Sequence, residues 1–167
     1  PQDRSSAASD VYKRQGPLSS PALVKRQVVG VFEKKLLKTF ANALKSLDIK
    51  FAWIVNSEDG LDEISPYAKT NVIQLKNNVI SEIVIDPKEL NINADKFKNL
   101  VGDDAKFNAN KMLEIFKGED NDFSKAVCLN AAAGLIVNET HEEFSEAYKD
   151  AREHILSNEV IKHLELS

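Results

Sequence analysis

The stretch IKFAWIV, residues 49–55, runs directly into the acidic segment NSEDGLDEIS, residues 56–65. An apolar run of this length is typical of a strand covered on both faces in a parallel sheet. The β-branched run at residues 28–32 predicts an earlier strand. Between the two strands, one helical face gathers five apolar side chains: Leu36, Leu37, Phe40, Leu44 and Leu47. Strand, helix and strand in this order predict a βαβ unit, with the acidic segment at a strand's carboxyl end, where open α/β sheets bind ligands.

The remaining sequence predicts a hairpin followed by helices. Residues 70–86, TNVIQLKNNVISEIVID, are largely β-branched and turn at Asn77-Asn78, which tolerates positive φ. Helical spacing follows over residues 104–117, ended by Gly118, and residues 124–137 are apolar nearly all round, as in a buried helix. Thr140 and Glu143 have capping-box spacing before a further helix. The predicted fold class is α/β: a partial, mainly parallel sheet with a βαβ unit, a β-hairpin and a C-terminal cluster of helices.

Composition excludes several classes of protein. The 167 residues suit one domain, and the net charge of -4 argues against a nucleic-acid or anionic-membrane binder, which would need a basic face. No apolar run reaches the length of a membrane-spanning helix. Cys128 is the single cysteine, so neither an intramolecular disulfide nor a thiolate metal site can form. We therefore expect a reducing, cytoplasmic location, with Cys128 acting as a small buried hydrophobe.

The first fifteen residues, PQDRSSAASDVYKRQ, differ from the rest of the chain. They are polar and serine-rich, without helical or strand periodicity, and they resemble translated sequencing-adaptor strings. We expect residues 1–15 to be a non-native or disordered leader without function, and residues 16–167 to form the folded unit.

Four carboxylates crowd the acidic segment: Glu58, Asp59, Asp62 and Glu63. Mg²⁺ prefers hard oxygen ligands and commonly binds through one or two carboxylates, with water and phosphate at its other positions. Asp62 and Glu63 are adjacent, and Gly60 permits a turn that brings them inward. Acidic turns are also common on solvated surfaces, so from the residues alone a Mg²⁺ site and a solvated turn both remain open.

Other candidates are better explained by structural roles. His141, His154 and His163 have no spacing of a metal triad, which favours solvated or packing roles. Asn130 is polar within an apolar helix, so we expect its amide to tie that helix to the backbone of a neighbouring loop. The sequence contains neither a nucleophile elbow nor a glycine-rich phosphate loop. Catalytic nucleophiles are therefore not assigned.

Three segments together resemble the anthranilate phosphoribosyltransferase family, whose fold is shared with nucleoside phosphorylases. They are GPLSSPALVKRQVVGVF from Gly16, EDGLDEIS from Glu58, and the pair DDAKFNANKMLEIFKGE and AVCLNAAAGLIV from Asp103 onward. The resemblance covers residues 16–167 and implies the C-terminal portion of such an enzyme. It implies transfer of the phosphoribosyl group of phosphoribosyl pyrophosphate (PRPP) to anthranilate, a step of tryptophan biosynthesis.

The resemblance also implies the roles of individual residues. The family's metal-binding Asp-Glu pair falls on Asp62 and Glu63, with Mg²⁺ neutralising the pyrophosphate, and Gly16 falls on the loop that lines the anthranilate pocket. Glu58 and Asp59 are then expected to shape the loop. The intact enzyme is expected to be a homodimer formed through an N-terminal helical domain.

The sequence departs from the family pattern in places. Ser19-Ser20 stands for the usual Thr-Asn, Asn56-Ser57 for His-Gly, and Asp103 for a glycine near Asn108. The family's Gly-Thr-Gly-Gly-Asp phosphate loop, lysine-containing ribose-phosphate loop, anthranilate-binding arginine and helical domain precede the Gly-Pro-Leu loop and have no counterpart here. We therefore expect a truncated chain without activity of its own. A pyrimidine-nucleoside phosphorylase of the same fold and a non-catalytic α/β binding module remain the alternatives.

Overall fold

A computed structural model of the chain describes residue 18, residues 23–93 and residues 104–165, so the predicted leader lies outside the described residues. Strand β1 (Arg26–Gly30), helix α2 (Leu36–Ser46) and strand β2 (Phe51–Ser57) form the βαβ unit, and β3 (Thr70–Lys76) and β4 (Val79–Ile85) form the hairpin. A short 3-10 helix, η1 (Pro87–Leu90), precedes helices α3 (Ala105–Phe116), α4 (Asp122–Val137), α5 (Phe144–Leu156) and α6 (Glu159–Glu165). The predicted α/β class is confirmed.

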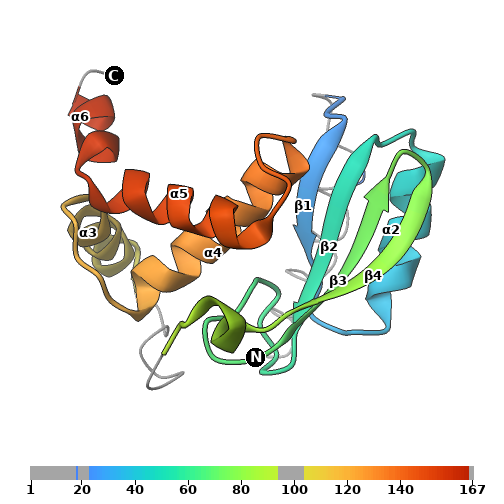
Figure 1. The fold of residues 1–167 in the computed structure, drawn as a ribbon, viewed down its shortest axis with the longest axis horizontal. Helices are drawn as coiled ribbons and strands as arrows, with labels where there is room; N and C mark the ends of the chain where they lie inside the picture. Colours follow the sequence, from blue (N-terminus) through green and yellow to red (C-terminus); the bar gives the residue numbers. More distant parts are fainter. Residues whose placement is uncertain (1–17, 19–22, 94–103, 166–167) are drawn as a thin grey trace.

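Strand β2 lies between two hydrophobic cores, and all seven of its residues are buried. Ala52 and Ile54 face the core that α2 builds from Leu37, Phe40, Ala41 and Leu44. The alternate residues Phe51, Trp53 and Val55 face the core built by α4 and α5. Figure 1 shows α2 on one side of the sheet and the C-terminal helices on the other. Period-two alternation therefore gives β2 an apolar side chain on each face.

The sheet is mixed, which corrects the expectation of a mainly parallel one. Its order is β1-β2-β3-β4, and among the described strands β1 and β2 pair in parallel while β2–β3 and β3–β4 pair antiparallel. A parallel return usually needs a crossover helix, whereas residues 58–69 reverse the chain so that Ser57 pairs with Thr70. Coverage by helices on both faces, rather than parallel pairing, explains why β2 is buried throughout and apolar from Phe51 to Val55.

Several predicted boundaries hold and others shift. Asn77 and Asn78 both have positive φ at the hairpin turn, and Gly118 has a φ of +96° after α3. Strand β1 begins two residues earlier than predicted, at Arg26. Leu47 follows the end of α2 and is 48% exposed, so it does not belong to the buried helical face.

The predicted capping box at Thr140 and Glu143 is wrong. Helix α5 begins at Phe144, and its N-cap Glu143 makes no side-chain capping bond. The Thr140 hydroxyl instead accepts a hydrogen bond from Asn138 Nδ2 (3.1 Å). A capping box does occur at α4, where Asn121 and Ser124 exchange side-chain to backbone bonds of 3.1 and 2.9 Å. Capping-box spacing alone therefore does not fix the start of a helix, because α5 begins beyond the reach of Thr140.

Helix α4 is the central helix of the larger core. Cys128, Leu129, Ala132 and Ala133 are each at most 1% exposed, which confirms the expected buried role of the cysteine. Burial raises the pKa of the Cys128 thiol to about 11. Among the described residues, no helix combines the length and the apolar character that crossing a membrane requires.

Cys128 should be inert to alkylation in the folded chain. With a pKa of about 11, its thiolate fraction at pH 8 is roughly a hundredfold below that of an exposed thiol, and burial blocks access as well. We expect iodoacetamide at pH 8 to label the guanidinium-unfolded chain fully while leaving the native chain unlabelled, as measured by intact mass. Equal labelling rates in both states would contradict the burial of this face of α4.

Candidate active site at the acidic loop

The acidic loop, residues 58–69, begins with a tight turn at the end of β2. The Ser57 amide donates to the Leu61 carbonyl (2.9 Å), and the Gly60 amide donates to the Ser57 carbonyl (3.1 Å). Gly60 has a φ of +93°, a conformation that favours glycine. The turn predicted at Gly60 is therefore confirmed, and it directs the chain back toward the carboxyl end of the sheet.

Asp59 braces this loop from within. Its Oδ1 accepts a hydrogen bond from the Leu61 amide (3.3 Å), and its Oδ2 accepts one from the Ser65 hydroxyl. Ser65 is fully buried, and its oxygen also accepts from the Tyr67 amide (3.0 Å). The loop-shaping role expected of Asp59 is confirmed. Glu58 has an exposed side chain and joins the loop through its amide, which donates to the Lys69 carbonyl (2.9 Å).

Asn130 ties helix α4 to the loop. Its Oδ1 accepts from the Ile64 amide (3.0 Å), and its Nδ2 donates to the Ile64 carbonyl (3.1 Å) and to the Ala126 carbonyl (2.9 Å). Neutral hydrogen bonds of this kind contribute about 0.5–1.5 kcal/mol each. The predicted helix-to-loop tie is confirmed, and it holds the residue immediately after Glu63.

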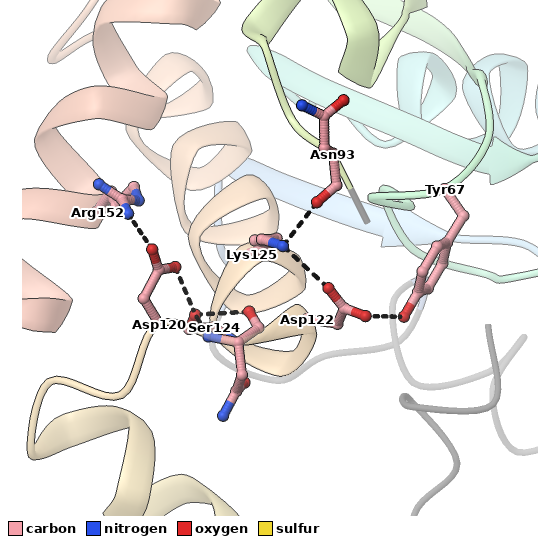
Figure 2. A network of polar contacts seen from close by, with 8 residues as sticks. Tyr67, Asn93, Asp120, Asp122, Ser124, Lys125 and Arg152 are labelled. Atoms are coloured by element: carbon pink, nitrogen blue, oxygen red, sulfur yellow. Dashed lines mark hydrogen bonds and ion pairs between the residues drawn. The ribbon is translucent and has the colours of Figure 1, made fainter. Parts of the chain in front are cut away.

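A second connection between α4 and the loop lies nearer the start of the helix. The Tyr67 hydroxyl donates to Asp122 Oδ2 (3.0 Å), and Lys125 Nζ donates to Asp122 Oδ1 (3.0 Å) and to the Asn93 carbonyl (2.8 Å). Figure 2 shows this network beside the pair formed by Asp120 and Arg152. Asp122 is only 8% exposed, and the Lys125 ammonium offsets its charge while the Tyr67 hydroxyl adds a hydrogen bond. Helix α4 thus holds the loop at Ile64 and again at Tyr67.

Gly30, at the end of β1, is in close contact with the loop. A Cβ added there would lie 1.6 Å from the Asp62 carbonyl oxygen. No side chain can occupy that space while the loop keeps its path. Sequence reasoning missed this residue, although a glycine within a β-branched run is a recognised signal of close backbone approach.

The loop, the end of β1 and helix α4 line an open cavity of about 710 Å³. Asp62 and Glu63 both line it, together with Gly30, Phe123, Val127 and Asn130. Asp62 is half-buried and Glu63 is exposed. The structure therefore brings the two predicted metal ligands to one cavity at the carboxyl ends of the parallel strands β1 and β2, as the βαβ reading predicted.

The donor set of this cavity suits a hard cation that is shared with a ligand. Two adjacent carboxylates supply oxygen only, which Mg²⁺ prefers and which soft metals do not. The part of the chain that the structure describes holds no group of three or more His, Cys, Asp or Glu side chains placed to bind a metal. An all-protein cage is therefore absent from those residues, whereas two carboxylates completed by water and phosphate oxygens fit.

The other predicted positions are distributed differently. Gly16, Ser19, Ser20 and Asp103 lie outside the described residues. Asn56 is buried and donates from Nδ2 to the Val31 carbonyl (2.8 Å), and the Ser57 hydroxyl donates to the Lys69 carbonyl (3.3 Å). Asn56 and Ser57, which stand where the family has His-Gly, therefore link the end of β2 to the end of β1 and to the start of β3.

The histidines belong to the C-terminal helical region. His154 contacts Asp150, whose backbone carbonyl raises the pKa of the imidazole, and the side chain is exposed. Nε2 of His141 lies 3.4 Å from the carboxylate Oδ2 of Asp150. Among the described residues, no histidine lines the cavity of Asp62 and Glu63. The expectation of non-catalytic roles for these side chains is consistent with this placement.

Comparison with known proteins identifies the family. The glycosyl transferase family, a/b domain, matches residues 8–159. The chain belongs to this family. Among curated relatives, the anthranilate phosphoribosyltransferase of Pelagibacter ubique is 73% identical over 154 residues, covering 92% of this chain and 47% of that protein. The enzyme of the same name from Alkaliphilus metalliredigens is 39% identical, covering 86% of this chain and 42% of its own length.

Solved structures of the family agree in fold. Anthranilate phosphoribosyltransferase from Thermus thermophilus is 28% identical with a TM-score of 0.79, and the Saccharomyces cerevisiae enzyme in complex with PRPP and Mg is 25% identical with a TM-score of 0.77. Each match covers 90% of this chain and 44% of the solved chain. The chain thus spans about half the length of the relatives it matches.

Two glycine substitutions should have opposite effects on stability. Gly30→Ala places a methyl group against the Asp62 carbonyl and should lower the free energy of unfolding by about 1–3 kcal/mol, as overpacking does. Gly134→Ala, in α4, meets no atom within 4 Å and should raise it by about 0.5–1 kcal/mol, because alanine favours a helix. Urea denaturation of both variants measures the difference. A neutral Gly30→Ala would contradict the close approach of loop and strand.

Proposed function

We propose that this chain is the C-terminal portion of an anthranilate phosphoribosyltransferase, which transfers the phosphoribosyl group of PRPP to anthranilate in tryptophan biosynthesis. The observation that carries the proposal is the pair Asp62 and Glu63 in one cavity at the carboxyl ends of β1 and β2. The names of the relatives in both comparisons support this reading over the nucleoside phosphorylase alternative. A cytoplasmic location fits the single buried thiol of Cys128.

The proposed reaction is a displacement at C1 of the ribose. The amine nitrogen of anthranilate forms a bond to C1 while the bond from C1 to the pyrophosphate oxygen breaks. Pyrophosphate leaves with the electron pair of that bond, and the amine loses a proton. Positive charge develops at C1 and negative charge on the leaving group. Charged groups held in fixed positions therefore stabilise the transition state more than a protein nucleophile would.

Asp62 and Glu63 are the residues that would hold Mg²⁺. When bound, Mg²⁺ supplies positive charge that neutralises the departing pyrophosphate. The chain's other residues contribute by positioning these two carboxylates. Asp59 and Asn130 fix the loop on which both carboxylates stand, and Gly30 allows that loop to lie against the strand end. Phe123 and Val127 line the same cavity with apolar surface.

The remaining groups that the reaction needs would come from the rest of the intact enzyme. The sequence has no Gly-Thr-Gly-Gly-Asp phosphate loop, and the chain spans about half of its relatives' length. Gly16 would line the anthranilate pocket, and the homodimer would form through the N-terminal helical domain.

We expect the chain alone to be inactive. Anthranilate fluorescence, followed with PRPP and Mg²⁺, should stay constant, and consumption of anthranilate would contradict the expected inactivity.

The carboxylates can be tested in a chimera, defined as the Pelagibacter ubique relative whose matched segment is replaced by that of this chain. Asp62→Asn and Glu63→Gln should each lower kcat/KM by about 10²-fold or more and raise the Mg²⁺ concentration for half-maximal rate. Glu58→Gln is the matched control, because Glu58 is an exposed carboxylate of the same loop outside the cavity lining. It should leave both values unchanged. Unaltered Mg²⁺ dependence in the Asp62 and Glu63 variants would favour a solvated acidic turn.

A further inference from the structure

We propose that Asn130 is a positioning residue for Asp62 and Glu63, so that helix α4 sets the geometry of the metal-binding pair. This inference rests on the proposed function of those carboxylates. Asn130 comes from a helix more than sixty residues later in the chain, yet it lines the same cavity and contacts the residue next to Glu63. It acts through the backbone of the loop.

The two carboxylates stand between two fixed points of the backbone. On one side, the Asp62 carbonyl is packed against Gly30. On the other, both polar backbone groups of Ile64 are paired with the Asn130 amide at 3.0 and 3.1 Å, and the Ile64 side chain is fully buried in the core. The backbone between these points has little freedom to shift toward solvent, so the positions from which the two side chains reach the cavity are restrained on both sides.

The chemistry at position 130 requires an amide. Oδ1 accepts one N–H, and Nδ2 donates to two carbonyls, those of Ile64 and Ala126, so the side chain uses both kinds of hydrogen-bonding group. An aspartate of nearly the same shape would direct a charged oxygen at those two carbonyls. It would therefore push the Ile64 backbone away from α4. A displacement of about 1 Å in a positioned group can cost 10²-fold in rate.

The test uses the chimera and compares three substitutions. Asn130→Asp should raise the Mg²⁺ concentration for half-maximal rate by about tenfold and lower kcat by about 10–100-fold, with KM for anthranilate unchanged. Asn130→Ala should act in the same direction while keeping the fold, because Asn130 is only partly buried and lines the cavity, so water can enter the vacated space and pair with the freed Ile64 groups. Asn138→Asp is the matched control, since the same chemical change occurs at the exposed end of α4.

Two outcomes separate positioning from a merely structural role. Hydrogen–deuterium exchange of residues 58–65 should accelerate in both Asn130 variants and not in Asn138→Asp. A structural role alone would lower the active fraction and the thermal midpoint, leaving the Mg²⁺ requirement of the remaining enzyme as in the wild type, and that result would overturn the proposal. If Asp62→Asn and Glu63→Gln change the Mg²⁺ dependence while the Asn130 variants do not, the positioning role fails and the proposed function stands. If none of these changes it, the proposed function itself fails.

Discussion

The structure depends on the burial of β2 on both of its faces. Every residue from Phe51 to Ser57 is buried, so the strand must have helices on each side and a neighbouring strand on each edge. This requirement fixes α2 on one face and α4 with α5 on the other. It also brings the end of β2 beside the end of β1, and the acidic loop begins where the two strands stop. The site follows from the packing of the core.

Helix α4 serves the core and the loop at the same time. Its buried face, which includes Cys128 and Leu129, packs in the core, while Asn130 and Asp122 hold Ile64 and Tyr67 of the loop. Adjacent carboxylates in one loop repel each other, and Ile64 is the loop residue that packs in the larger core. The loop is kept in place by backbone pairing to a helix that the core has already immobilised. Rigid presentation of a functional loop by a packed scaffold is a common arrangement in enzymes.

Much of this could be predicted from sequence because local patterns carried it. The apolar run in residues 49–55, the helical faces and the turn at Asn77-Asn78 each reflect short-range geometry. The role of Asn130 was predictable too, because an amide within an apolar helix must find partners. Three features were not predictable from these patterns: the antiparallel return of β3, the start of α5 and the contact at Gly30. The return of β3 and the contact at Gly30 depend on how segments distant in sequence meet, which spacing within one segment does not report. The start of α5 was missed because the capping-box spacing of Thr140 and Glu143 lies ahead of a helix that begins only at Phe144. Locating Asp62 and Glu63 in one cavity required both the sequence pattern and the fold.

The contact between the Asp62 carbonyl and Gly30 limits how such chains can diverge. A side chain can enter at position 30 only together with a loop path that no longer crosses the end of β1, and such a path carries the acidic pair elsewhere. Two changes, each harmful alone, must then arise in concert. Single substitutions at Gly30 are therefore disfavoured in evolution. Exposed positions of the hairpin such as Val79 and Val84 do not have this constraint.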